Sequence, residues 1–338
     1  METRENISLK GLNTFQVDAA AEAYIRFDAE DEILDFLADG HLDARRYLVL
    51  GGGSNLLFLG DFHGVVLHPA MKGISVVGCE PDHIRVKAMA GEAWDDLVAF
   101  AVGRGWGGIE NLSLIPGCVG ASVIQNIGAY GVEVRTAVER VEAISLADGR
   151  RAAFTPAECD FGYRCSRFKD ERHGRFMITA VVFRLCRRPT CVIRYPGVQE
   201  AVAHIGAPTV GNLRRAIIQI RESKLPDPVV IPNAGSFFKN PVVTGAALDR
   251  VRSVAPDVPS YPLGGGRFKL PAGWLIEQCG WKGRTHGHAA VHRDHALVLV
   301  NNGNATGQEI YDLSERIRQS VSSWFGLTLE REVVVVRS

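Results

Sequence analysis

Two uncharged, glycine-rich segments in the first half of the chain place the strongest constraint on its fold. The first, Gly51-Gly52-Gly53-Ser54-Asn55, follows an apolar segment at 47–50, and the second, IPGCVGASVIQNIGAYG, covers residues 115–131. Glycine makes up 36 of the 338 residues, above its usual share of about 7%. Either segment alone would be interpreted as ordinary tight turns. Two together, without a lysine, favour a bound dinucleotide whose pyrophosphate is held by converging backbone N–H groups.

The first segment matches neither of the two common phosphate-binding motifs. A Rossmann loop requires G-x-G-x-x-G opening directly into a helix, but the third glycine position is Leu56 and residues 56–69 have the pattern of a second strand. A Walker loop requires Gly-Lys followed by Ser or Thr, and the sequence contains none. We therefore expect a strand–loop–strand element.

Apolar periodicity predicts an α+β fold, because strands occur in runs with only occasional helices between them. The longest helix is expected to end at Gly326. The side chains expected on its buried face are Ile310, Leu313, Ile317, Val321 and Trp324. The proline-rich stretch 225–241 is the best candidate for a domain boundary. The predicted helices cover residues 28–40, 92–103, 213–221, 272–279 and 308–325, and the predicted strands cover 47–50, 64–67, 138–146, 151–154, 176–185, 191–195, 296–301 and 328–336.

The charge balance and the cysteines exclude several classes of protein. Lys plus Arg and Asp plus Glu both number 38, so a surface dedicated to nucleic acid or to an anionic membrane is not expected. The charged N-terminal residues lack a signal segment, and the longest uncharged stretch, 111–132, contains Pro116 and several glycines and is a poor membrane helix. The seven cysteines are scattered, which predicts reduced thiols in a cytoplasmic protein without a zinc ribbon.

Taken together, the motifs resemble the UDP-N-acetylenolpyruvoylglucosamine reductase (MurB) family in its type I form. The resemblance covers about residues 10–336 and rests on NTF (13–15), GGGSNLL (51–57), IPGCVGASVIQNIGAYG (115–131), GYRCSRFK (162–169), KLPDP (224–228), NAGSFFKNP (233–241), AGWLIEQCGWKG (272–283), AVHRDHALVLVN (290–301) and LEREV (329–333). It implies a vanillyl-alcohol-oxidase-type, two-subdomain FAD-binding fold plus a C-terminal α+β substrate-binding domain. The expected domains are 1–70, joined by strand 328–338, then 71–224 and 225–327.

The resemblance also implies the reaction. FAD would take a hydride from NADPH and pass it from N5 to the vinyl carbon of UDP-N-acetylglucosamine enolpyruvate, giving UDP-N-acetylmuramate for peptidoglycan synthesis. The partners implied are this UDP-sugar enolpyruvyl ether and NADPH. No nucleic acid and no membrane are expected, and a monomer is favoured. Without a Rossmann domain, the nicotinamide is expected to enter the same site as the sugar nucleotide.

Three residues match the family's catalytic positions. Ser236 would donate a proton to the substrate carbon, with an ordinary turn serine as the alternative. Arg164 would bind the substrate carboxylate, the alternative being an ion pair with Asp160 or Asp170. Glu332 shares a predicted strand face with Val334 and Val336, where a carboxylate is costly unless it has a function. Glu330 lies on the same face and competes with it.

The remaining expected site residues follow from the same matching. Tyr195 is followed by Pro196-Gly197 where the family more usually has Gly-Asp, which leaves the conformation of its loop open. The expected cofactor-binding residues are Gly51, Gly52, Gly53, Ser54, Asn55, Pro116, Gly117, Gly120, Ala121, Ser122, Gln125, Asn126 and Gly128. The expected substrate-binding residues are Tyr163, Tyr195, Lys224 and Asn240.

Two rival interpretations stay open at this point. The chain could be another oxidase of the same flavin fold that acts on an alcohol or a sugar lactone. Alternatively, His286, His288, His292 and His295 could hold a zinc ion in a regulator or sugar-nucleotide binder. Cysteine or acidic partners at ligand spacing are missing, so no metal is expected.

Overall fold

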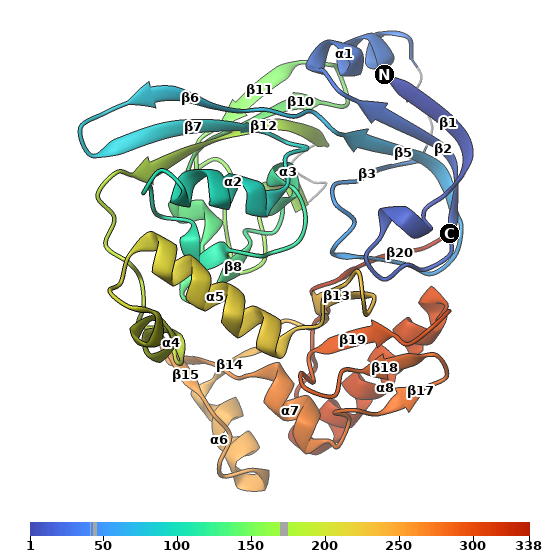
Figure 1. Ribbon diagram of the computed structural model, residues 1–338. Coiled ribbons are helices and arrows are strands. Elements are labelled where there is room, and N and C mark those ends of the chain that lie inside the picture. The colour runs from blue at the N-terminus through green and yellow to red at the C-terminus, as the bar shows by residue number, and fades with distance from the viewer. Residues whose placement is uncertain (41, 43–45, 170–174) are drawn as a thin grey trace. The chain divides into compact units, whose positions relative to one another are not determined.

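The computed structural model describes residues 1–40, 42, 46–169 and 175–338 (Figure 1). The chain forms two compact units, each assembled from three separate segments. Unit 1 contains 1–7, 22–52 and 64–223, and unit 2 contains 8–21, 53–63 and 224–338. The division into three domains expected from the sequence stays a prediction.

The first sheet of unit 1 has four strands in the order β1-β2-β5-β3. Helix α1 (Glu30–Ala38) follows β2 and buries Ile33 and Phe36 in the core of the unit. The segment expected to be one strand after the first glycine segment is two strands, β4 (Leu56–Phe58) and β5, because residues 59–61 turn the chain between them. The sheet consists of β1 (Glu2–Ser8), β2 (Ala20–Phe27), β5 (Phe62–Pro69) and β3 (Tyr47–Val49).

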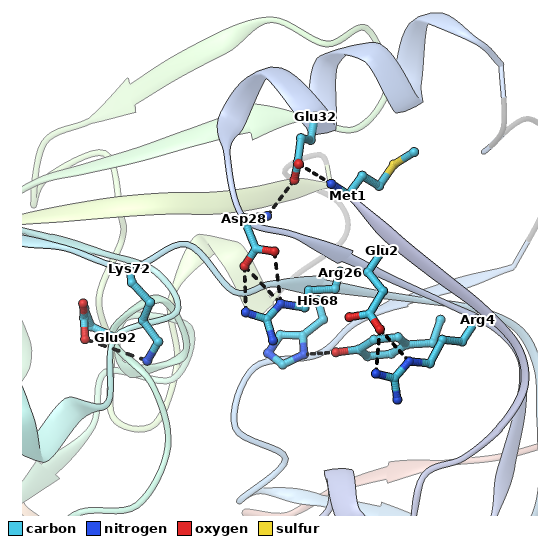
Figure 2. A network of polar contacts seen from close by, with 10 residues as sticks. Met1, Glu2, Arg4, Arg26, Asp28, Glu32, His68, Lys72 and Glu92 are labelled. Atoms are coloured by element: carbon cyan, nitrogen blue, oxygen red, sulfur yellow. Dashed lines mark hydrogen bonds and ion pairs between the residues drawn. The ribbon is translucent and has the colours of Figure 1, made fainter.

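Polar side chains connect β2 to β5 in this sheet. The Tyr24 hydroxyl lies 2.6 Å from Nδ1 of His68, and Arg26 forms an ion pair with Asp28 at 2.7 Å. Figure 2 shows His68 beside this Arg26–Asp28 pair. Burial lowers the pKa of His68, so its neutral form is favoured in the folded protein.

The second sheet of unit 1 has five antiparallel strands in the order β11-β10-β12-β7-β6. The predicted hairpin at Asp148-Gly149 is confirmed, since β10 pairs with β11 across it. The Trp94 ring lies 5.9 Å from that of Phe183 on β12 and joins the core of the unit. The elements are β6 (Ile74–Cys79), β7 (His83–Met89), α2 (Trp94–Val102), α3 (Val119–Ser122), β8 (Gly128–Ala129), β9 (Val132–Glu133), β10 (Val138–Ser145), β11 (Arg151–Phe154) and β12 (Phe176–Cys186).

The strand predicted at 191–195 is wrong. These residues are described and belong to no strand, because the segment is held by side chains: Nδ2 of Asn111 donates to the Val192 carbonyl at 2.8 Å. Cys191 and Ile193 pack against a small core between helices α4 (Val198–Ile205) and α5 (Val210–Lys224).

Unit 2 contains a four-stranded sheet in the order β13-β19-β18-β17 and a three-stranded sheet in the order β14-β16-β15. Its core gathers apolar side chains from both sheets and from three helices. The elements are β13 (Asn233–Ser236), β14 (Val242–Thr244), α6 (Gly245–Val254), β15 (Tyr261–Gly264), β16 (Arg267–Lys269), α7 (Ala272–Gln278), β17 (Thr285–His286), β18 (Ala289–Val291), β19 (Val298–Asn301) and α8 (Gly307–Phe325).

Helix α8 confirms most of its prediction. Thr306 and Glu309 form a capping box at its start, and Gly326 ends it with a φ of 65°. The predicted inward residues are buried with one exception: Trp324 is 60% exposed, and Phe325 takes the inward position. After Val321 the inward face continues at either i+3 or i+4, and the helix uses i+4.

The strand predicted at 328–336 is too long. Only β20 (Val334–Val336) is a strand, and it pairs in parallel with β4, whereas Arg331 forms a single antiparallel bridge with Phe238. Among the described residues, no helix combines the length and the apolar run needed to cross a bilayer.

Candidate active site

The two glycine segments contact each other within unit 1. A Cβ on Gly52 would lie 2.8 Å from the Gly117 Cα, and a Cβ on Gly51 would lie 2.8 Å from Sγ of Cys118. Such distances are shorter than any ordinary carbon contact. Glycine is therefore required at these positions to let the two backbones approach each other, which the turn interpretation does not explain.

The Cys118 thiol lies at this contact and is largely buried from solvent. Burial raises the pKa of the Cys118 thiol, so the thiol is neutral. Gly120 packs closely as well, since a Cβ there would lie 2.8 Å from the Ala90 Cβ. The two glycine segments approach so closely that a side chain on either would disturb the contact. Such glycine backbone, free of side chains, suits a flavin dinucleotide, whose pyrophosphate can be held by backbone N–H groups. The residues present therefore fit FAD.

The division between the two units falls inside the first glycine segment, between Gly52 and Gly53. In unit 2, Gly53 has a φ of +62° and a Cβ there would lie 2.0 Å from the Leu12 carbonyl oxygen. Asn55 holds the C-terminal segment twice: its Nδ2 donates to the Glu332 carbonyl at 3.2 Å, and its own carbonyl accepts from the Val334 N–H at 3.0 Å.

Unit 2 brings Ser236 and Glu332 close together through the backbone. The N–H of Glu332 donates to the carbonyl of Phe237 at 2.8 Å, one residue after Ser236. Ser236 is half-buried at the end of β13, and Glu332 is only 9% exposed. The structure therefore joins two predicted catalytic residues that are far apart in the sequence.

The structure also separates Glu332 from its competitor Glu330. The Glu330 side chain is 73% exposed and forms an ion pair with Lys239 at 3.0 Å. The reasoning from a shared strand face is wrong, because Glu332 precedes β20 and Val334 is itself exposed. Glu332 is nevertheless buried, and its backbone is held by Phe237 and Asn55.

Arg164 lies in unit 1, beside the second glycine segment. It has a φ of +55°, its Nη2 donates to the Gly128 carbonyl at 2.8 Å, and its guanidinium lies 5.6 Å from the Tyr163 ring centre. A Cβ on Gly128 would lie 3.1 Å from Nη1 of Arg164. Asp170, one of the alternative ion-pair partners, lies outside the described residues.

Besides Asn55, two predicted cofactor-binding side chains of the second glycine segment form hydrogen bonds inside the protein. The Ser122 hydroxyl donates to the Val119 carbonyl at 2.6 Å. The Asn126 amide donates to the Gly162 carbonyl at 3.0 Å and so fixes the position of the segment that carries Tyr163. Pro116, Ala121 and Gln125 lie in the same segment, and Ser54 lies in the first one. A cofactor role for all of these residues stays a prediction.

The Tyr195 loop is a tight turn in which the Val198 N–H donates to the Tyr195 carbonyl at 3.0 Å. Gly197 has φ 82° and ψ −12°, as position i+2 of a type II turn requires, and proline is favoured before it. The Pro-Gly pair therefore gives a defined turn that holds Tyr195, which is 47% exposed. The expectation that Tyr195 ends a strand is wrong.

Neither Tyr130, which contacts Tyr195, nor Arg221, which contacts Tyr130, was expected from the sequence as a site residue. The ring of Tyr130 packs edge-on against that of Tyr195 with 5.4 Å between centres, and Arg221 hydrogen-bonds to the Tyr130 side chain while burial lowers its pKa. Tyr130 lies inside the quoted motif 115–131, and Arg221 precedes Lys224 by one helical turn on α5. Helical spacing from Lys224 was the signal that could have identified Arg221.

The other two predicted substrate-binding residues lie in unit 2. Lys224 is exposed at the end of α5. Asn240 accepts a hydrogen bond from the Ala272 N–H at 2.8 Å through Oδ1, so its amide oxygen holds the start of α7.

Three of the four clustered histidines, His288, His292 and His295, have separate partners. Nδ1 of His288 lies 3.4 Å from Glu309, whereas the rings of His292 and His295 accept backbone N–H groups of residues 294 and 297. In the part of the chain that the structure describes, no three metal-binding side chains are grouped around one point.

Comparison with known proteins gives matches along nearly the whole chain. The profile of the UDP-N-acetylenolpyruvoylglucosamine reductase C-terminal domain matches residues 227–336, and that of an FAD-binding domain matches 21–154. The reductase of this name from Burkholderia ambifaria is 48% identical over 96% of this chain and 94% of its own. The one from Bacteroides fragilis is 43% identical over 97% and 98%. The crystal structure of MurB from Thermus caldophilus has a TM-score of 0.70 and 26% identity, and the match covers 99% of both chains.

Proposed function

The chain belongs to the UDP-N-acetylenolpyruvoylglucosamine reductase family, and on that premise we propose how its own residues carry the reaction. It is an FAD-containing, NADPH-dependent oxidoreductase that reduces UDP-N-acetylglucosamine enolpyruvate to UDP-N-acetylmuramate in peptidoglycan precursor synthesis. When bound, FAD supplies the hydride, which comes from NADPH and goes to the vinyl carbon of the substrate.

Ser236 is the proton donor in this proposal. Hydride addition at the terminal vinyl carbon places negative charge on the neighbouring carbon and its carboxylate. An alcohol is a weak acid, but this carbon is a stronger base still, so the Ser236 hydroxyl can protonate it. The pairing of Glu332 with Phe237, one residue from Ser236, is the observation that best supports this assignment.

Arg164 and Glu332 act on the substrate carboxylate. The guanidinium fork of Arg164 suits a carboxylate that gains charge during the reaction, and the Gly128 carbonyl and the Tyr163 ring orient it. Glu332, buried and held by its backbone, polarises the same group. Arg164 lies in unit 1 and Glu332 lies in unit 2.

The glycine segments are assigned to FAD and the remaining residues to the sugar nucleotide. Tyr163, Tyr195, Lys224 and Asn240 bind the substrate, and Tyr130 and Arg221 support Tyr195.

NADPH and the sugar nucleotide use the same site in turn, so double-reciprocal plots should be parallel. Intersecting lines would contradict this. We further propose a cytoplasmic monomer with the three domains 1–70 plus 328–338, 71–224 and 225–327.

Replacement of Ser236 tests the proton donor. Ser236→Ala should leave FAD binding and flavin reduction by NADPH nearly unchanged, and it should slow reoxidation by the enolpyruvyl substrate by about 10²–10⁴-fold. Ser236→Cys should retain partial activity, because a thiol is the stronger acid. Loss and return of flavin absorbance report the two half-reactions separately.

Ser253→Ala is a matched control, because the Ser253 hydroxyl is exposed and bonds only within α6, to the Arg250 carbonyl. It should leave both half-reactions unchanged. If Ser236→Ala slows both half-reactions equally or loses its flavin, Ser236 is a structural turn residue and the assignment fails.

A further inference from the structure

Arg331, which neighbours Glu332, is fixed against helix α8 by three kinds of contact. Its guanidinium lies over the Tyr311 ring, 4.4 Å from the ring centre. Its Nε donates to the Ser314 hydroxyl at 3.0 Å, and it forms an ion pair with Glu315. The side chain is only 16% exposed. Contacts of this number at low exposure leave the side chain a single conformation.

The backbone at Arg331 is the centre of the pairing that brings Glu332 beside Ser236. Arg331 bridges Phe238, with the Lys239 N–H donating to the Glu330 carbonyl at 2.9 Å on one side and the Glu332 N–H donating to the Phe237 carbonyl at 2.8 Å on the other. This pairing is short and lies outside the named sheets. A pairing of this length needs support from side chains to keep its register.

Arg318, a residue of α8 itself, holds Leu329, two residues before Arg331. Nε of Arg318 donates to the Leu329 carbonyl at 2.9 Å, and its Nη1 lies 2.7 Å from Glu315. Glu315 is thus shared by both arginines. Helix α8, a rigid element of the unit 2 core, therefore fixes the segment 329–331 just before Glu332.

We propose that Arg331 is a positioning residue: its contacts with Tyr311, Ser314 and Glu315 on α8 hold the Phe238–Arg331 bridge in register and thereby set the place of the Glu332 carboxylate. This inference rests on the role proposed above for Glu332. Arg331 itself does not need to touch the substrate, since it acts through the backbone. A misplacement of about 1 Å at a reacting group can cost roughly 100-fold in rate.

Half-reaction kinetics of the holoenzyme test the proposal. Arg331→Ala should slow flavin reoxidation by the enolpyruvyl substrate by about 10- to 100-fold and leave flavin reduction by NADPH unchanged. Arg331→Lys keeps the charge beside Glu315 but loses the guanidinium Nε. Its rate of flavin reoxidation should therefore lie between those of the wild type and Arg331→Ala. Arg316→Ala, at an exposed arginine of helix α8, should match the wild type in both half-reactions. Equal slowing of both half-reactions, or no slowing, would overturn the proposal.

A double-mutant cycle shows whether Arg331 acts through Glu332. In a Glu332→Ala background, Arg331→Ala should have no additional effect on reoxidation, whereas multiplied effects would refute the proposal. If Glu332→Ala alone leaves reoxidation unchanged, the proposed role of Glu332 fails and this inference fails with it. If Glu332→Ala slows reoxidation but Arg331→Ala does not, only this inference fails.

Amide hydrogen exchange gives a readout that does not depend on turnover. In Arg331→Ala holoenzyme, the peptide that contains the Glu332 amide should exchange faster, because the pairing with Phe237 opens more often, and the β18–β19 peptides should not change. Ser314→Ala removes only the acceptor of Nε and should give a smaller increase at the same peptide, which keeps the test valid if Arg331→Ala folds poorly. Unchanged exchange at Glu332 in both variants would exclude the positioning role.

Discussion

Replacing Gly52 by alanine should separate the two glycine segments of unit 1. Gly52 lies outside the left-handed region, so its backbone accepts alanine, but the new Cβ would lie 2.8 Å from the Gly117 Cα and 3.4 Å from its carbonyl carbon. Ordinary carbon contacts begin at about 3.5 Å, so the two backbones must move apart by about 0.7 Å. Overpacking of this kind costs about 1–3 kcal/mol, and rigid backbone on both sides prevents easy relief.

The cost appears in one of two measurable quantities. If the segments relax apart in the apoprotein and FAD must bring them back, the dissociation constant of FAD rises by about 5- to 150-fold, the equivalent of 1–3 kcal/mol. If they stay in contact, the Tm of the apoprotein falls by about 2–12 °C. Flavin fluorescence titration measures the first and thermal unfolding the second.

Gly11→Ala is the matched control, because nothing lies within 4 Å of a Cβ there and its backbone is also outside the left-handed region. This variant should bind FAD and unfold like the wild type. A Gly52→Ala protein with unchanged FAD affinity and unchanged Tm would refute the argument that glycine is needed for the contact with Gly117.

Three further predictions concern stability. Burial lowers the pKa of His68, so stability should decrease as the pH falls below about 6.5 toward the folded-state pKa. His68→Gln should flatten this dependence in thermal unfolding between pH 5 and 7. Thr306→Ala should lower the free energy of unfolding in urea by about 1 kcal/mol. The pKa of its capping partner Glu309 is about 2. The stabilisation from that carboxylate should therefore persist at neutral pH and decline as the pH falls from about 4.5 toward 2. Ile317→Ala should lower the free energy of unfolding by about 2–5 kcal/mol. Trp324→Ala, at an exposed site, should change it by no more than about 0.5 kcal/mol. Similar losses in both variants would contradict the observed inward face of α8.

Local sequence patterns predicted the elements whose stability is local. Helix α8 has a capping residue, a strong period and a terminal glycine, and all three signals agree with the structure. The β10–β11 hairpin has alternating residues and a favourable turn, and its pairing is also local. Only the last turn of α8 was assigned wrongly, because Trp324 and Phe325 fit the apolar face almost equally well.

Elements that depend on a distant partner were not predictable from such patterns. Residues 191–195 include the β-branched Val192 and Ile193, but a strand also needs a neighbouring edge, and this segment meets the Asn111 side chain instead. Only the family resemblance implied that the C-terminal strand joins residues 1–70, and no local pattern shows that β20 pairs with β4. In the candidate site, motif matching selected Glu332 over Glu330, yet the cause of the difference, the bridge between Phe238 and Arg331, is visible only in the structure.

The pairing of β4 with β20 has a consequence for synthesis on the ribosome. Leu56–Phe58 leave the ribosome early, but their partners Val334–Val336 follow roughly 280 residues later, about 15–55 s at usual elongation rates. During that interval Leu57 and Phe58, fully buried in the folded protein, have no strand to pair with. Unit 2 therefore cannot complete its fold before residues 334–336 have emerged, and the nascent chain should depend on chaperones that shield this apolar segment during that interval.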